Sequence, residues 1–121
     1  PCITIADEIN DPNALDVRFW NSGQLRHDYN TADMEHSVSE LVAWASEIMT
    51  LNSGDVIGCD TNHEGLGPLQ DGDLAEIEIE GIGRMALHVA DPLRRIWERG
   101  IYKGRDSTHP DITNSQDPLF R

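Results

Sequence analysis

A strict alternation of residue types over positions 75–80 restricts the fold of this chain more than any other feature. Alanine and isoleucines occupy the odd positions, and glutamates occupy the even ones. Because successive side chains of a strand point to opposite faces, the run predicts a β-strand with one face on a core and one face in water. Past Gly81-Ile82-Gly83 the alternation returns over 84–89, so we expect a second, antiparallel strand behind a glycine bend.

Shorter extended patterns occur earlier in the chain. Apolar and polar residues alternate over 15–20, Asn21-Ser22-Gly23 interrupts them, and an extended pattern resumes over 24–28. Two such runs about a tight turn that contains glycine predict a β-hairpin. A weaker alternation predicts a short strand over 2–7, and the run 55–59 is a further short strand candidate.

One helix is clearly predicted, over Ser37–Met49. Ser37 and Glu40 have the spacing of a capping box, in which each side chain satisfies a backbone N–H group of the first turn. Apolar residues at helical spacing form one stripe, namely Val38, Leu41, Val42, Ala45, Ile48 and Met49. We expect Asn52-Ser53-Gly54 to end the helix, since asparagine and glycine accept the left-handed conformation common at helix C-termini.

These elements together predict a mixed, mainly β fold, a largely antiparallel β-roll with one main α-helix. No internal repeat and no regular alternation of strands and helices occurs, which argues against a doubly wound sheet. Residues 1–92 hold the strands and the main helix and form the predicted domain. Residues 93–121, with one amphipathic turn over Leu93–Trp97, have no core of their own and form a polar, basic tail.

The net negative charge belongs entirely to the predicted domain. Residues 1–92 carry 18 acidic and 3 basic side chains, whereas residues 93–121 carry 4 and 6. Nucleic acid is therefore not an expected partner, because phosphate neutralisation requires a basic face. A dense acidic surface most often serves solubility and less often attracts metal cations. The apolar fraction of 38% is low for one compact domain of 121 residues, which points to a partner.

Cysteine usage and hydropathy indicate a cellular setting. Cys2 and Cys59 are too few for a disulfide framework and lack the spacing of a zinc knuckle, so a reduced, cytoplasmic setting is expected. Cys59 is predicted to be a small buried hydrophobe rather than a nucleophile. No apolar run approaches the length of a membrane span and the N-terminus has no signal-peptide pattern, so no membrane is expected as a partner.

The loop 58–67 is the first candidate for chemistry. It follows a predicted strand and combines polar side chains with Gly65 and Gly67, and such loops let a backbone approach a ligand and offer N–H donors. One interpretation is a lip that binds an anionic substrate through the Thr61 hydroxyl and nearby amides. The other is a wide turn whose Asp and Asn side chains satisfy only the local backbone.

Three groups of ionisable residues invite metal or acid–base hypotheses. On a regular strand His27-Asp28 cannot serve one site, because adjacent side chains point to opposite faces, whereas His63-Glu64 lies in a loop and could. Glu76, Glu78 and Glu80 share one face, but their regular spacing opposite isoleucines is typical of a solvated sheet face. No serine elbow, phosphate-binding glycine loop, CxxC or HExxH motif occurs.

Several segments taken together resemble a known family. In chain order they are Ile5-Ala6-Asp7-Glu8 with Asp11-Pro12, Asn30-Thr31-Ala32-Asp33-Met34, the helix Ser37–Met49 with Thr50-Leu51, Gly54-Asp55-Val56-Ile57, Gly65-Leu66-Gly67-Pro68-Leu69, Gly72-Asp73 and Glu76–Gly83. In this order and spacing they resemble the C-terminal portion of the fumarylacetoacetate hydrolase family, over roughly residues 3–92. An ordered set of this kind is more specific than any single motif.

The resemblance implies a β-roll with an active site at its mouth, in a divalent-metal-dependent enzyme that acts on 2-oxo or 1,3-diketo acids by C–C bond hydrolysis, decarboxylation or isomerisation. In the family, Mg²⁺ or Mn²⁺ chelates the 2-oxo acid and stabilises an enolate. The metal ligands come from an earlier Glu-x-Glu strand and a later Asp, and an earlier histidine activates water. Glu76-Ile77-Glu78 matches a different strand that holds no metal, so catalytic and metal-binding residues are expected outside this chain.

One family role is carried over to this sequence by the resemblance. A threonine in the loop motif Thr-Gly-Thr-Pro-x-Gly-Val-Gly contacts substrate carboxylate and matches Thr61, and we expect Asn62 and Gly65 of the same loop to bind substrate as well. The sequence departs from the motif, since Asp60 replaces a glycine and Asn62-His63-Glu64 replaces the Pro-x pair with one extra residue. A carboxylate at Asp60 beside an anionic substrate is unfavourable unless it is paired or points away, which leaves the substrate class open.

Two classes of function follow from the resemblance. In the first, the chain is one part of a split, cleaved or truncated enzyme and is inactive alone. Its N-terminal part then lies on another chain or in a missing segment, and the expected partners are an oxo acid substrate and further copies in a homodimer or higher oligomer. In the second, the chain is a non-catalytic binding or assembly module that keeps the roll and has lost the chemistry.

Overall fold

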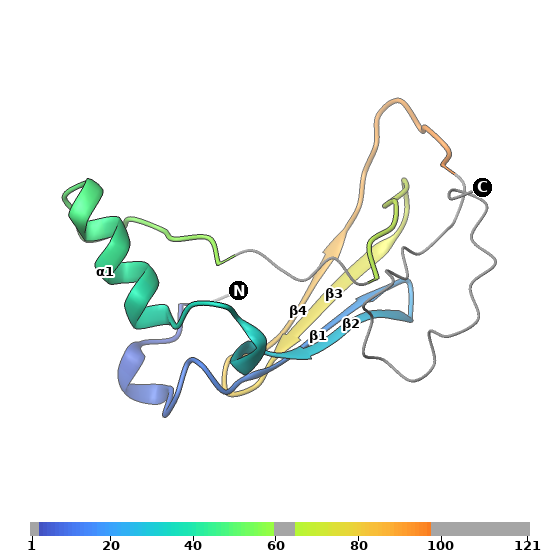
Figure 1. The fold of residues 1–121 in the computed structure, drawn as a ribbon. Helices are drawn as coiled ribbons and strands as arrows, with labels where there is room; N and C mark the ends of the chain where they lie inside the picture. Colours follow the sequence, from blue (N-terminus) through green and yellow to red (C-terminus); the bar gives the residue numbers. More distant parts are fainter. Residues whose placement is uncertain (1–2, 60–64, 98–121) are drawn as a thin grey trace, which may run out of the picture.

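In the residues that it describes, the computed structural model shows one antiparallel sheet and a single α-helix (Figure 1). The structure describes residues 3–59 and 65–97. The four strands of the sheet, in the spatial order β2-β1-β3-β4, are β1 (Asp16–Asn21), β2 (Gln24–Asn30), β3 (Leu74–Ile79) and β4 (Gly83–His88). The helices are α1 (Val38–Ile48) and two short 3₁₀ helices, η1 (Ala6–Glu8) and η2 (Thr31–Asp33). The predicted mainly β class with one main helix is confirmed.

Both predicted strand pairs are present, and a long-range pairing joins them. The β1–β2 hairpin turns at Ser22 and Gly23, which have φ values of 50° and 80°, as a tight hairpin turn requires. The second pair turns at Gly81-Ile82, where the Ile82 N–H donates to the Ile79 carbonyl at 3.0 Å. Strands β1 and β3 then pair antiparallel, with Phe19 opposite Ile77. This pairing places the apolar side chains of both hairpins on one face.

The opposite face of the sheet carries the glutamates of β3. Arg84 on β4 forms ion pairs with Glu76 at 3.0 Å and with Glu78 at 3.6 Å, and its guanidinium lies 4.5 Å from the centre of the Trp20 ring. This face is therefore charged, and the Arg84 guanidinium links its glutamates to Trp20. The observation agrees with the interpretation of the acidic run as a solvated surface.

Helix α1 begins as its sequence predicts. The Ser37 N–H donates to the Glu40 carboxylate at 2.7 Å and the Glu40 N–H donates to the Ser37 hydroxyl at 3.3 Å, so the capping box is complete. The hydrogen bond from the Ser37 N–H also lowers the pKa of the Glu40 carboxyl below its ordinary value.

The end of α1 differs from the prediction. Met49 leaves the helix in an extended conformation, with φ −144° and ψ 155°. The left-handed residue Gly54, with φ 98°, instead belongs to a separate turn in which the Asp55 N–H donates to the Asn52 carbonyl at 3.1 Å. The backbone is thus redirected once at the helix end and again five residues later.

Apolar side chains of the described residues are mostly not buried. Figure 1 shows α1 projecting away from the sheet, and none of its residues is buried. Trp44 is 66% exposed and Ile48 is 60% exposed. Among the described residues Val17 is the single buried apolar side chain, whereas the buried polar ones are Asn21, Arg26, His27, Gln70 and Asp73. The few buried side chains of the described residues are thus mostly polar, and many large apolar ones are exposed, which is the reverse of a self-contained domain.

Three local predictions are wrong. The segment predicted as a strand over 2–7 contains η1 instead, and no strand precedes Asp16 in the described part of the chain. Residues 55–59 form no strand, because no neighbouring strand pairs with them. The turn predicted over Leu93–Trp97 lies earlier, at 91–94, where the Arg94 N–H donates to the Asp91 carbonyl at 2.8 Å. In each case a weak local pattern lacks the pairing or packing that would stabilise it.

Candidate functional site

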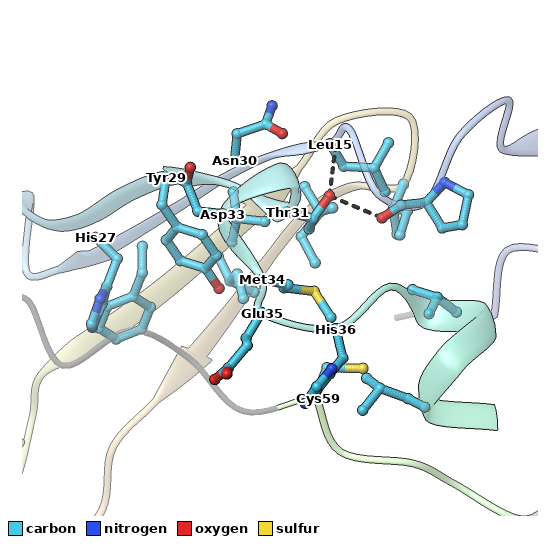
Figure 2. Close-up of a pocket in the computed structure, with 18 residues that line it drawn as sticks. Leu15, His27, Tyr29, Asn30, Thr31, Asp33, Met34, Glu35, His36 and Cys59 are labelled. Carbon is cyan, nitrogen blue, oxygen red and sulfur yellow. Dashed lines mark hydrogen bonds between the residues drawn. The ribbon is translucent and has the colours of Figure 1, made fainter. Parts of the chain in front are cut away.

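A cavity of about 910 Å³ opens on the apolar face of the sheet, between the sheet and the start of α1 (Figure 2). Its floor is formed by side chains of the three strands β1, β2 and β3, namely Val17, Phe19, His27, Tyr29, Ile77 and Ile79. Its wall is formed by the segment 30–36, by Val38 and Leu41 of α1, and by Cys59. The cavity is large enough for a small-molecule ligand and is lined mainly by apolar groups.

The Asn30–Met34 run fixes the wall of this cavity. The Asn30 side chain accepts a hydrogen bond from the Ala32 N–H at 2.9 Å and so caps η2. The Thr31 hydroxyl accepts from the Leu15 N–H at 2.8 Å and donates to the Pro12 carbonyl at 2.9 Å, as the dashed lines of Figure 2 show. Within the described residues this run therefore serves to tie η2 to the segment before β1.

An aromatic row crosses the cavity floor. The rings of Phe19 and His27 lie 5.6 Å apart at a tilt of 53°, and those of His27 and Tyr29 lie 6.5 Å apart, edge to face. His27 is 9% exposed. Asp28 points to the other face, where it accepts a hydrogen bond from Arg18 Nε at 3.2 Å. As predicted, His27 and Asp28 do not serve one site.

The ionisable side chains at the rim of the cavity do not form a metal centre. Asp33, Glu35, His36 and Cys59 all line the cavity, and Figure 2 draws Cys59 next to His36. In residues 3–59 and 65–97, no three or more His, Cys, Asp or Glu side chains come together in a way that could hold a metal ion. The described residues therefore do not fit a divalent cation.

Cys59 is exposed, which corrects the prediction that it is buried. The prediction depended on a strand over 55–59, and without that strand no layer of side chains covers the thiol. Its sulfur lies 4.0 Å from the Ile57 carbonyl and contributes to the cavity wall.

Of the three residues predicted to bind substrate, the structure describes Gly65 and not Thr61 or Asn62. Thr61 and Asn62, together with Asp60 and His63-Glu64, lie outside the described residues. Gly65 is described and buried, with φ +73°. A side chain at this position would overlap the backbone carbonyl of Arg26, so the chain passes directly over β2 here.

A buried polar network lies at the turn end of the β1–β2 hairpin. The Asp73 carboxylate accepts hydrogen bonds from Asn21 Nδ2 at 2.9 Å, from the Gln70 N–H at 2.9 Å and from the Ser22 hydroxyl at 3.3 Å. Asn21 and Asp73 are each 2% exposed. The loop that leads into β3 is thus attached to β1 by buried hydrogen bonds.

Sequence reasoning missed this network. Gly72-Asp73 was one of the motifs that resemble the family, with no partner predicted for it, and Gln70 carried no prediction. The available signal was the polar run Asn21-Ser22-Gly23 opposite Asp71-Gly72-Asp73, but nothing local shows that the two turns meet.

The comparisons with known proteins agree with this architecture. The family described as fumarylacetoacetate (FAA) hydrolase C-terminal matches residues 1–90. A maleylpyruvate hydrolase of Aquipseudomonas alcaligenes is 40% identical over 89 residues, which are 74% of this chain and 31% of that protein. A 4-hydroxyphenylacetate degradation bifunctional isomerase/decarboxylase of Escherichia coli is 43% identical over 79 residues, which are 65% of this chain and 18% of that protein.

Solved structures give the same result. The crystal structure of maleylpyruvate hydrolase from Sphingobium sp. SYK-6, in complex with manganese(II) and pyruvate, is similar with a TM-score of 0.70 at 43% identity, covering 73% of this chain and 33% of that one. A 5-carboxymethyl-2-hydroxymuconate delta-isomerase from Mycobacterium smegmatis has a TM-score of 0.63 at 41% identity, covering 66% and 32%.

The fold and the family match define this chain as the C-terminal portion of a larger protein family's fold, which in the described residues contains a four-stranded sheet. The chain belongs to the fumarylacetoacetate hydrolase family, as its sequence motifs predicted. It spans about a third or less of the length of the relatives described above. No helix in the described part of the chain has the length and apolar character needed to cross a bilayer.

Proposed function

We propose that this chain supplies the substrate-facing part of a divalent-metal-dependent enzyme that acts on 2-oxo or 1,3-diketo acids, by C–C bond hydrolysis, decarboxylation or isomerisation. The observation that carries the proposal is the similarity, at 43% identity and a TM-score of 0.70, to a maleylpyruvate hydrolase solved with manganese(II) and pyruvate. Pyruvate is itself a 2-oxo acid, and relatives with hydrolase, isomerase and decarboxylase names share the same domain.

In this proposal the metal and the catalytic groups belong to the complementary part of the domain. That part corresponds to the two thirds of the maleylpyruvate hydrolase structure that this chain does not cover. The open apolar cavity and the exposed side chains of α1 support the proposal, because apolar surfaces of this kind mark contact surfaces. Mg²⁺ or Mn²⁺ is the expected cation. Residues 1–92 form the domain, with 93–121 as a separate tail.

The substrate-binding residues are proposed to be Thr61, Asn62 and Gly65. Thr61 would contact the substrate carboxylate through its hydroxyl, and Asn62 and Gly65 would contribute polar groups of the same loop. We further propose a reduced, cytoplasmic setting, for which the low cysteine content is the support, and a homodimer or higher oligomer as the working form.

The test is reconstitution of activity. The 121-residue chain is combined with a segment that carries the Glu-x-Glu strand and the catalytic histidine, and pyruvate release from an acylpyruvate is measured with Mn²⁺ or Mg²⁺. We expect turnover by the assembly and none by either part. Thr61→Ala in the assembly is expected to raise KM about tenfold, since a hydrogen bond to a charged substrate group is lost.

Two outcomes would contradict the proposal. Turnover by the chain alone with added Mg²⁺ would place the metal site on this chain. Tight binding of pyruvate without turnover by the assembly would support a non-catalytic binding module instead.

A further inference from the structure

Strand β2 contains a bulge at Arg26. The pairing with β1 is regular up to Phe19 opposite His27, and it then continues with Trp20 opposite Leu25. Arg26 is the extra residue between these two pairs. Arg26 is 7% exposed and His27 is 9% exposed, although neighbours on a regular strand would point to opposite faces. The bulge therefore turns the Arg26 side chain inward, as bulges near ligand sites often do.

The segment that begins at Gly65 lies directly against this bulge. Gly65 has φ +73°, and a Cβ atom there would overlap the Arg26 carbonyl oxygen, so a glycine is required for both reasons. Three residues further on, the Pro68 carbonyl accepts a hydrogen bond from Arg26 Nη2 at 3.3 Å. Arg26 thus contacts the segment twice, through its backbone and through its guanidinium.

The other end of the same segment is fixed by the Asp73 network. The Gln70 N–H donates to Asp73, which also accepts from Asn21 of β1. Gln70 is 8% exposed. The segment from Gly65 to Asp73 is therefore attached to both strands of the hairpin, at the bulge of β2 and at the end of β1.

From these contacts we infer that Arg26 is a positioning residue that sets the place of Gly65 in the substrate-binding loop. The inference rests on the proposed function, in which Gly65 contributes to binding of an oxo acid. The guanidinium is suited to the role because delocalisation holds its donors in one rigid plane, and the buried side chain restricts where that plane lies. A displacement of about 1 Å at a substrate-binding loop is enough to reduce activity by one to two orders of magnitude.

The experiment compares Arg26→Gln and the conservative Arg26→Lys with a matched control, Arg18→Gln. Arg18 lies on the neighbouring strand, is 44% exposed and pairs with Asp28 at the surface. Hydrogen exchange over residues 65–70 is measured in the 121-residue chain. KM, kcat and the apparent Mn²⁺ affinity are measured in the reconstituted assembly, with an acylpyruvate as substrate.

We expect Arg26→Gln to raise exchange over 65–70 and to raise KM about tenfold, while kcat and the Mn²⁺ affinity change less than about twofold. Arg26→Lys keeps a donor on a flexible stem, so its KM and its exchange over 65–70 should lie between those of the wild type and of Arg26→Gln. Arg18→Gln should change none of these values. This separation of KM from kcat and metal affinity distinguishes positioning from a general loss of stability.

The outcomes separate the inference from the function on which it rests. If the wild-type assembly turns over no oxo acid, the proposed function is wrong and the role of Arg26 falls with it. If the wild-type assembly is active and both Arg26 variants keep its KM, the positioning role alone is overturned. A raised KM accompanied by equally large decreases in kcat and in Mn²⁺ affinity, with no recovery in Arg26→Lys, would also overturn the positioning role.

Discussion

The turn end of the β1–β2 hairpin and the open side of the sheet are organised in opposite ways. At the turn end, Asn21 and Asp73 are each 2% exposed and are joined by a hydrogen bond of 2.9 Å. On the open side, α1 buries none of its residues, and Trp44 is 66% exposed. Buried polar groups need specific partners, whereas exposed apolar groups need only a surface to cover them. The turn end is therefore held together by buried hydrogen bonds within this chain, with Asn21 Oδ1 left unpaired among the described residues, and the open side supports the proposal of a complementary part.

The largest expected effect is at the centre of the turn end. Asp73→Ala removes the acceptor of three hydrogen bonds and leaves buried donors on Asn21 and Gln70. Unsatisfied buried donors cost roughly 1–3 kcal/mol each, so we expect the free energy of unfolding to fall by about 3 kcal/mol. Urea unfolding followed by tryptophan fluorescence measures it.

The matched control for this variant is Asp71→Ala. Asp71 is exposed and accepts a hydrogen bond from the Asp91 N–H at 3.0 Å, so its loss should lower the free energy of unfolding by less than about 1 kcal/mol. Equal losses for the two variants would show that burial does not distinguish the turn end.

The next prediction compares two glycine substitutions, of which one changes only the backbone conformation and the other also causes a steric overlap. Gly65 and Gly72 both have positive φ values, 73° and 84°, but a Cβ at Gly72 meets nothing within 4 Å. Gly72→Ala should cost about 1 kcal/mol of unfolding free energy for its conformation alone, and Gly65→Ala should cost at least about 2 kcal/mol because it also displaces the Arg26 backbone. Denaturant unfolding of both variants provides the measurement, and similar values would argue against the close contact.

On the open side the cap of α1 is the main local source of stability. Ser37→Ala removes the hydroxyl that accepts from the Glu40 N–H and should lower the free energy of unfolding by about 1 kcal/mol, with a smaller far-UV circular dichroism signal at 222 nm. A separate contribution comes from the hydrogen bonds that Ser37 donates to the Glu40 carboxylate and that lower its pKa: it is present above the ordinary pKa of a glutamate and is lost as the pH falls through the lowered value.

The pH dependence of that signal should therefore decrease only in part in Ser37→Ala, which loses the hydroxyl but keeps the backbone N–H that donates to Glu40, and should disappear in Glu40→Gln, which has no carboxylate. Ser46→Ala is the control, because the Ser46 hydroxyl donates only to the Ala43 carbonyl within the helix. If Ser37→Ala and Ser46→Ala lose equal amounts of the circular dichroism signal at 222 nm, the cap does not stabilise the helix.

Exposed apolar residues of α1 should contribute little to the chain by itself. Trp44→Ser is expected to change the free energy of unfolding by less than about 0.5 kcal/mol, as for other surface substitutions. Thermal unfolding monitored at 222 nm tests this value. A loss above 1 kcal/mol would mean that α1 already packs on another surface, and the contrast between the two regions would not hold.

The smallest effect concerns a surface carboxylate after β4. The Arg95 side chain, and then the Leu93 N–H, donate to Asp91 and lower the pKa of its carboxyl from 3.8 to about 2. The stabilisation is thus fully present above pH 3.8 and is lost as the pH falls to about 2. In Arg95→Gln an NMR titration should find the Asp91 pKa closer to 3.8, and an unchanged value would refute the assignment of the cause.

Sequence reasoning predicted the two hairpins, the helix with its cap, and the family. Each depends on a periodic pattern or on an ordered set of motifs, which are properties of neighbouring residues. The failures share a cause as well. The strand predicted over 55–59 had a suitable pattern but no pairing partner, and the burial of Cys59 was inferred from that strand.

The sequence by itself determined the positions of the turns, the faces of the strands and the start of α1, because local sterics and side-chain alternation act over a few residues. Only the tertiary structure decided that Asn21 meets Asp73 across 52 residues and that Arg26 meets Pro68 across 42. Long-range strand pairing and the bulge in β2 set these contacts, and neither leaves a local pattern. The contacts of Arg26, which is inferred to position the substrate-binding loop, therefore follow from the tertiary structure and not from a local sequence pattern.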